Sequence, residues 1–131
     1  MRLSEHFEMS ELECRCCGQC HMDPTLMDKL ELLRSLAGGL PLHVNSGYRC
    51  PVHNAEVGGS PRSAHLRGLA VDIAVPSGGR MHQLLGAAFA AGFPRIEQGN
   101  NYLHVDIDDT LPCPCSWINP LGCRESNAGI E

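Results

Sequence analysis

The sequence has no uninterrupted apolar segment of the roughly 18 residues that a membrane-spanning helix needs. Its first six residues carry charges where an export signal would need an apolar run. Charged residues are not gathered in blocks of one sign, and the net charge is −5. This pattern provides neither a basic surface for nucleic acid nor a polybasic patch for anionic lipid. We therefore expect no export signal, no membrane insertion and no nucleic-acid partner.

Internal repeats and low-complexity segments are also missing. A chain of 131 residues is long enough for one domain with its own core and too short for two typical ones. We expect a single domain over 1–131 with a cysteine-rich N-terminal segment (1–22) and a cysteine-containing C-terminal tail (109–131). We expect this domain to be a monomer.

Cysteine, in contrast, is abundant and clustered towards both ends. The eight cysteines are Cys14, Cys16, Cys17, Cys20, Cys50, Cys113, Cys115 and Cys123. Cys-x-Cys and Cys-x-x-Cys steps are typical of a structural zinc knuckle, in which His21, next to Cys20, could replace a thiolate. Disulfides are the alternative, and since adjacent Cys16 and Cys17 do not bridge each other easily, each would need a more distant partner. Free thiols, or a metal shared between tails in an assembly, are further readings that the sequence leaves open.

Two helices are indicated by apolar spacing. Asp23 before a proline is typical of a helix start, and leucines at helical spacing predict a helix over 24–36 that stops at a glycine pair. An alanine-rich apolar run predicts a second helix over 81–91, capped by Ser77 or Gly79.

Strands are indicated by alternation of apolar and polar residues. This pattern predicts strands over 40–45, 69–75 and 102–108, whereas 48–62 is rich in turn-forming residues and is interpreted as irregular. The sequence therefore predicts an α+β fold, with an antiparallel sheet of about four strands and helices packed on one side.

A possible metal site follows from residues 63–72 (SAHLRGLAVD) and the later His104-Val105-Asp106. If these segments are strands and turns of one sheet, His65, Asp72 and His104 meet on one face. Two imidazoles and a carboxylate are the set that a catalytic zinc ion takes from a protein, because its remaining position is left for a water. The leading hypothesis is a zinc hydrolase whose ligands face a cleft.

At these residues the chain resembles the M15 family of zinc peptidases, which includes D-Ala-D-Ala carboxypeptidases and bacteriophage endolysins, and specifically its small, compact branch. The resemblance covers most of the chain, from Phe7 to Trp117. The matching residues are Ser63, His65, Gly68, Ala70, Asp72, His104 and Asp106, the Ser46-Gly47-Tyr48-Arg49-Cys50 turn, His53-Asn54 and Val57-Gly58-Gly59.

The resemblance implies a hedgehog/DD-peptidase-like fold in which His65, Asp72 and His104 bind one catalytic zinc ion. It also implies a zinc metallopeptidase that acts on a peptidoglycan stem peptide or a D-Ala-D-Ala dipeptide of the bacterial cell wall. With no export signal expected, the protein would act in the cytoplasm or be delivered to the wall by a phage or prophage.

Three further residues take roles from the resemblance. Arg49 lies where the family keeps an arginine for the terminal carboxylate of the substrate, a role that suits the planar fork of a guanidinium. Ser63 and Asp106 look like groups that orient the zinc ligands, and Ser63 is also a candidate for substrate binding.

One position departs from the family pattern. Better-known members place an acidic residue, the general base, three positions before the last ligand, and here Asn101 stands there. Glu97 is the nearest upstream carboxylate and the candidate base, with Asp106 as the other possibility. Because a lost base typically costs 10²- to 10⁴-fold in rate, the alternative is a catalytically weak zinc-containing module that binds the cell wall or has a structural role.

For two other residues the sequence favours a structural role over a functional one. His53 is interpreted as a residue that orders its loop rather than a ligand. Trp117 is interpreted as a core plug for the tail rather than a platform for substrate.

Overall fold

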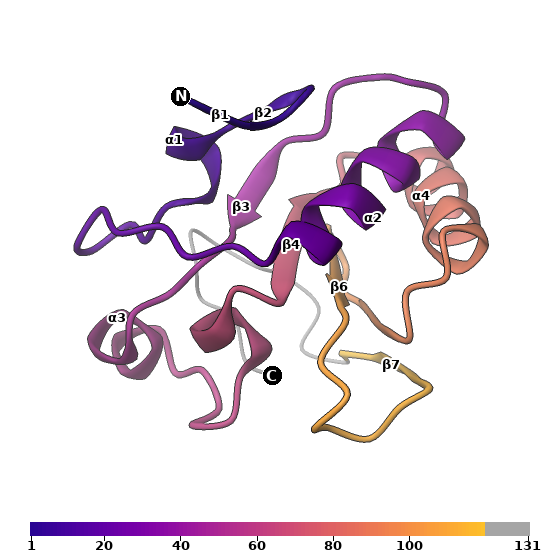
Figure 1. Ribbon diagram of the computed structural model, residues 1–131. Coiled ribbons are helices and arrows are strands. Elements are labelled where there is room, and N and C mark those ends of the chain that lie inside the picture. Colours follow the sequence, from indigo (N-terminus) through magenta and orange to yellow (C-terminus); the bar gives the residue numbers. More distant parts are fainter. Residues whose placement is uncertain (120–131) are drawn as a thin grey trace.

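The computed structural model describes residues 1–119, and its elements are traced in Figure 1. In chain order they are β1 (Arg2–Ser4), β2 (Phe7–Glu8), α1 (Met9–Leu12), α2 (Pro24–Leu36), β3 (Val44–Ser46), α3 (Pro51–Glu56), the 3-10 helix η1 (Ala64–Arg67), β4 (Ala70–Ala74), α4 (Gly78–Ala90), β5 (Arg95–Gln98), β6 (Tyr102–Asp106) and β7 (Cys115–Ile118). This mixture confirms the predicted α+β class.

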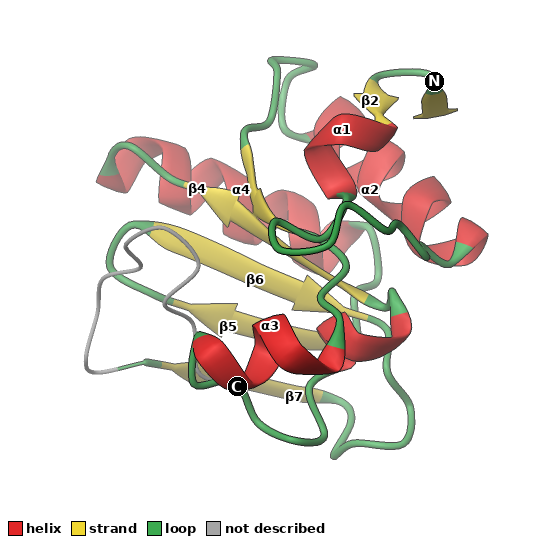
Figure 2. Ribbon diagram, turned by 90° about the vertical axis from the view of Figure 1, so that its left-hand side faces the viewer, coloured by secondary structure: helices red, strands yellow, loops and turns green. Residues whose placement is uncertain are grey.

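The main sheet has five strands in the order β3-β4-β6-β5-β7, one more than the sequence predicted. Neighbouring strands are antiparallel except for β5 and β7, which are parallel. Strands β1 and β2 form a separate antiparallel pair near the N-terminus. Figure 2 shows β4, β6, β5 and β7 side by side, with α3 on the viewer's side of the sheet and α4 behind it.

The two long helices form where they were predicted. Asp23 caps α2, because its carboxylate accepts hydrogen bonds from the backbone N–H groups of Thr25 (2.8 Å) and Leu26 (3.4 Å). Ser77, rather than Gly79, caps α4, and its hydroxyl accepts from the Arg80 N–H at 3.1 Å. The two helices contact each other, as Figure 1 shows at its upper right.

One face of the sheet makes the apolar core with these helices. The buried core side chains of the sheet are Val44, Val71, Ile73, Ile96, Leu103 and Val105, and those of α2 and α4 are Leu26, Met27, Leu30, Leu33, Met81, Leu84, Ala87 and Ala88. Side chains alternate along a strand, so the residues between these core positions point to the opposite face. That opposite face carries the polar residues discussed below.

The prediction of an irregular segment over 48–62 was wrong, because α3 occupies 51–56. Pro51 begins the helix, and the Cys50 sulfur accepts from the His53 N–H at 3.4 Å. Proline is favoured at a first helical position, but sulfur is not among the usual capping groups, which is why the pattern was missed. The long helices α2 and α4 pack on one side of the sheet, as predicted, and the short helix α3 lies on the other side (Figure 2).

Strand lengths differ modestly from the prediction. The strand expected over 40–45 is found over 44–46, and the one expected over 102–108 ends at Asp106. None of the helices in the part of the chain that the structure describes has the length and apolar character needed to span a membrane.

Candidate metal centre

His65, Asp72 and His104 lie together on the polar face of the sheet. One nitrogen of each histidine and a carboxylate oxygen of Asp72 all lie within 4.8 Å of one another. The three side chains come from η1, β4 and β6, and all three are fully buried. The two imidazole centroids are 5.3 Å apart. This is the grouping that the sequence predicted.

The register of the sheet brings two of these residues together. Asp72 on β4 is directly opposite His104 on β6, and Glu97 on β5 is opposite His104 on its other side. Directly opposed residues point to the same face of a sheet. Ser46 on β3 and Trp117 on β7 extend the row at its two ends.

His65 is positioned by local backbone contacts. Ser63 caps η1 by accepting a hydrogen bond from the His65 N–H at 3.2 Å. Gly68 ends this helix at φ 68°, and a Cβ there would lie 1.7 Å from the carbonyl oxygen of His21. Only glycine fits this position, which explains its place in the motif.

The ring nitrogens of the two histidines have distinct partners. His65 Nδ1 lies 2.6 Å from the carbonyl oxygen of Gly47, and His104 Nε2 lies 2.7 Å from a carboxylate oxygen of Asp106. Since a carbonyl oxygen only accepts, His65 Nδ1 carries the proton of its neutral ring. The other nitrogens, His65 Nε2 and His104 Nδ1, point towards Asp72 Oδ1, at 3.4 Å and 2.8 Å. His104 therefore lies between two carboxylates, and a cation beside Asp72 would leave its N–H on the side of Asp106.

This arrangement fits a zinc ion. One nitrogen of each imidazole and a carboxylate oxygen converge in a buried place, and a divalent cation would accept a lone pair from each of the three. Each histidine also gives its other N–H to an oxygen, which is the usual arrangement around ligating histidines. Asp106 in turn receives a charged hydrogen bond from Arg95 Nε, with a shortest separation of 2.9 Å.

Arg49 is fully buried beside the same carboxylate. Its guanidinium donates to Ser46 Oγ (3.1 Å), Asn54 Oδ1 (3.2 Å) and Asp72 Oδ2 (3.4 Å). In this structure Arg49 therefore holds Asp72, and a contact with a substrate carboxylate stays a prediction.

Glu97 and Asn101 are placed very differently. Glu97 is buried on β5, and the Tyr102 hydroxyl donates a short hydrogen bond to its Oε2. The Asn119 amide donates to that hydroxyl at 2.9 Å. Asn101 is exposed in the loop before β6, outside the row of residues across the sheet.

Trp117 is a neighbour of the site that sequence reasoning missed. Its ring lies 6.0 Å from the His104 ring, between centroids, and the Arg95 guanidinium carbon lies 4.8 Å from its centroid. The side chain is only partly buried. The interpretation of Trp117 as a core plug overlooked β7, whose short, partly polar sequence gave no clear strand pattern.

The sequence predicted that the three candidate ligands face an open cleft. In the structure all three side chains are fully buried. Of the cavities found, one of about 500 Å³ lies at the end of β4 and is lined by residues including Leu42, Val75 and Asn101. A smaller one of about 180 Å³ is lined partly by Trp117 and by apolar residues of α4 and β7. Trp117 therefore contacts His104 of the candidate metal centre and also lines this smaller cavity.

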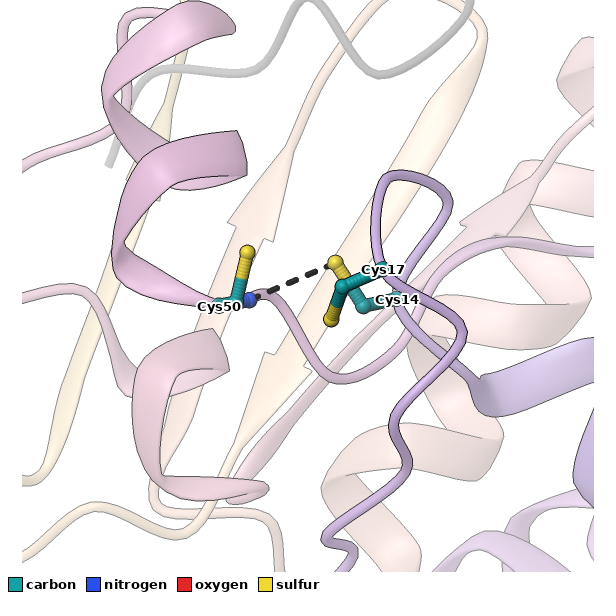
Figure 3. Close-up of side chains that lie close together, drawn as sticks. All are labelled: Cys14, Cys17 and Cys50. Carbon is teal, nitrogen blue, oxygen red and sulfur yellow. Dashed lines mark hydrogen bonds between the residues drawn. The ribbon is translucent and has the colours of Figure 1, made fainter.

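A second donor cluster lies near the N-terminus of α3 and is drawn in Figure 3. The sulfur atoms of Cys14, Cys17 and Cys50 all lie within 4.8 Å of one another. The Cys50 N–H donates to the Cys14 sulfur at 3.4 Å. Burial alone would raise the pKa of Cys14, but backbone hydrogen bonds, that of Cys50 the strongest, bring it down to about 7.

An adjoining group places donor atoms of Cys16, His53 and Glu56 within 4.8 Å of one another. Burial, and then the positive charge of Arg49, lowers the pKa of His53. The role of His53 in ordering its loop stays a prediction.

The remaining cysteines are not part of these groups. Within residues 1–119 all seven cysteines are free thiols, and Cys20, Cys113 and Cys115 belong to neither group. Cys123 lies outside the described residues.

Together, the α+β fold and the His-Asp-His set define a protein with the donor arrangement of a metallopeptidase. A family model described as peptidase M15 matches residues 5–106, which is more than half of the chain. The chain therefore belongs to the peptidase M15 family.

A curated relative agrees with this assignment. The chain is 39% identical over 84 residues to the zinc D-Ala-D-Ala carboxypeptidase of Streptomyces albus G. The match covers 60% of this chain and 32% of the relative, so the chain spans about a third of the length of that protein.

Proposed function

We propose that the protein is a zinc-dependent peptidase that hydrolyses a peptide bond next to D-alanine in peptidoglycan-type peptides. The observation that carries the proposal is the buried convergence of His65 Nε2, His104 Nδ1 and Asp72 Oδ1 on one face of the sheet. Membership of the peptidase M15 family and the name of the Streptomyces relative support the class of reaction and of substrate.

His65, Asp72 and His104 would hold the zinc ion. A zinc ion at such a site supplies electrophilic activation of a water molecule and of the scissile carbonyl. Gly47 and Asp106 fix the orientation of the two imidazoles by accepting their other N–H groups. Ser63 caps the turn that carries His65, and its contact with substrate stays a prediction.

Glu97 is our candidate for the general base. Its carboxylate lies on the strand next to His104, at the directly opposed position. The Tyr102 hydroxyl donates to its Oε2 and so helps to orient the carboxylate. Asp106 is less suited to this role, because it already accepts from His104, Arg95 and the Asp108 N–H.

Arg49 is fully buried and donates to Ser46, Asn54 and Asp72. These hydrogen bonds favour a role as a positioning residue for Asp72, and the contact with the terminal carboxylate of a substrate stays a prediction. Under this proposal the charge of Arg49 stabilises the metal ligand, and an arginine at this place is compatible with both carboxypeptidase and endopeptidase action.

The test is the variant Glu97→Gln, assayed by release of D-alanine from a peptide that ends in D-Ala-D-Ala. Removal of a general base should lower the rate about 10²- to 10⁴-fold, while the zinc content stays at the level of the parent. The matched control is Asn101→Asp, which restores an acid where better-known relatives have one. If Asn101→Asp raises the rate and Glu97→Gln does not lower it, the assignment of the base is wrong.

The competing function is a zinc-containing module that binds the cell wall without turnover, and the exposed Asn101 is the observation that favours it. The parent protein distinguishes the two. Binding of the peptide with no release of D-alanine at any pH would overturn the peptidase proposal and support the binding module.

A further inference from the structure

The cysteine cluster beside α3 is built from two distant parts of the chain. Cys14 and Cys17 lie in the loop after α1, and Cys50 precedes the first residue of α3. Their sulfur atoms lie within 4.8 Å of one another, and Cys14 is buried whereas Cys17 is exposed. Three sulfur atoms at this spacing lie close enough to share one metal ion.

The surrounding backbone holds the two segments firmly together. The Tyr48 N–H donates to the Leu12 carbonyl at 2.9 Å, and the Cys50 N–H donates to the Cys14 sulfur at 3.4 Å. A Cβ at Gly47 would lie 2.7 Å from the same Leu12 oxygen. The close approach of the two segments is therefore part of the fold.

The sequence step from Cys14 to Cys17 is Cys-x-x-Cys, which allows two thiolates of one short loop to reach a tetrahedral ion. Four sulfur ligands in tetrahedral geometry favour zinc. Cys16 precedes Cys17 in the same loop, and its sulfur lies within 4.8 Å of donor atoms of His53 and Glu56 on α3, the helix that Cys50 caps. Its side chain is exposed and so is able to turn towards the other three.

We propose that Cys14, Cys17 and Cys50, with Cys16 as fourth ligand, bind a second, structural zinc ion that clamps the loop after α1 to the start of α3. This site is separate from the His-Asp-His centre and does not depend on the proposed peptidase function. Arg49, next to Cys50, holds Asp72, so the clamp also fixes the segment that supports the other centre.

The first experiment counts zinc by elemental analysis in protein purified without added metal. We expect two zinc ions per chain in the parent and one in His65→Ala. Cys17→Ser is the main variant, because Cys17 is exposed and its loss should not prevent folding. It should also reduce the count to one, whereas the control Cys20→Ser, in the same loop but outside the cluster, should keep two.

A second measurement identifies the ligands directly. In the His65→Ala background, cobalt(II) should give the intense near-ultraviolet absorption of thiolate-to-cobalt charge transfer. Cys14→Ser, Cys16→Ser and Cys17→Ser should each weaken this absorption, and Cys20→Ser should not. Retention of the full absorption in Cys16→Ser would overturn its assignment as the fourth ligand.

A disulfide is the competing chemistry, and intact mass after thiol alkylation under denaturing conditions separates the two. Four alkylatable thiols among Cys14, Cys16, Cys17 and Cys50 are expected after the metal is removed. A disulfide that includes Cys50, or a zinc count that Cys17→Ser leaves unchanged, would overturn the proposal. Neither result depends on peptidase activity, so failure of the clamp is distinguishable from failure of the proposed function.

Discussion

The two donor clusters of this protein differ in what holds them in place. His65, Asp72 and His104 are buried and fixed by strand register, a capped turn and partners for their ring nitrogens. The cysteine cluster combines a loop with the start of a six-residue helix, and its thiols range from buried to exposed. In the first cluster the side chains themselves are fixed by the sheet, whereas in the second the backbone segments are held together and a metal ion would order the exposed thiols.

The largest effect is expected for a substitution that disrupts the His-Asp-His cluster alone. His65→Ala removes one of three proposed ligands, and we expect hydrolysis to fall by roughly 10³-fold or more, as for loss of other essential catalytic groups. Cys17→Ser should keep activity within about tenfold, because the loop lies outside the reacting centre. The measurement is D-alanine release at saturating substrate, with circular dichroism to verify folding. Equal losses in the two variants would contradict the separation of the clusters.

For Arg49, which connects the two regions, we expect a loss of stability. Arg49→Met leaves Asp72 buried without its cationic partner, and breaking a buried ion pair typically costs about 3–5 kcal/mol. The comparison is made by urea unfolding of metal-free protein. Arg2→Met, which removes an exposed ion pair with Glu8, should cost less than about 1 kcal/mol. Similar losses in both would show that the buried contacts of Arg49 do not stabilise the fold.

Alanine substitutions at two glycines with positive φ test how tightly the backbone is packed in each of the two regions. Gly68→Ala would place a Cβ 1.7 Å from a backbone oxygen beside the His65 turn, whereas at Gly18, in the cysteine loop, a Cβ meets nothing within 4 Å. Gly18→Ala should therefore cost only the roughly 1–2 kcal/mol of a left-handed L-residue, and Gly68→Ala clearly more. Thermal unfolding of both variants tests this order, and the reverse order would contradict it.

The smallest effect is expected outside both clusters, on the pH dependence of stability, where Glu31 of α2 contacts His6. Glu31 Oε2 accepts from the His6 N–H at 2.7 Å. Burial raises the pKa of Glu31, but the nearby Ser4 hydroxyl and His6 outweigh it, and the pKa falls below its ordinary 4.5. A lowered carboxyl pKa contributes stability above pH 4.5 that is lost as the pH falls through the folded-state value. In urea unfolding from pH 7 to 3, Glu31→Gln should remove up to about 1 kcal/mol of this dependence; an unchanged profile would contradict it.

Regular elements were predictable wherever their own sequence carried the pattern. The helix over 24–36 begins at a capping aspartate and shows leucines at helical spacing, and β4 and β6 alternate clearly. Strands β5 and β7 were not predicted, because each is four residues long and gains its structure from pairing with a neighbour. Helix α3 was missed because a cysteine takes the capping position.

The candidate centre was predictable in its members but only partly in its surroundings. Alternation put His104 and Asp106 on one face, and the motif supplied His65 and Asp72. The position of Glu97 opposite His104 depends on the pairing of β5 with β6, which is a long-range property that spacing does not reveal. The same is true of Trp117, and of the burial of Arg49.

The pairing of β4 with β6 has a consequence for folding. Asp72 and His104 are 32 residues apart in the sequence and meet because their strands align in one register. A slip of one residue would turn His104 into the apolar core, since neighbouring side chains point to opposite faces. A chain in which β4 and β6 have paired in the wrong register, or have not yet paired, therefore lacks the complete donor set. Metal binding would therefore distinguish correctly folded molecules from misfolded ones, because only a sheet in the native register brings all three donor side chains together.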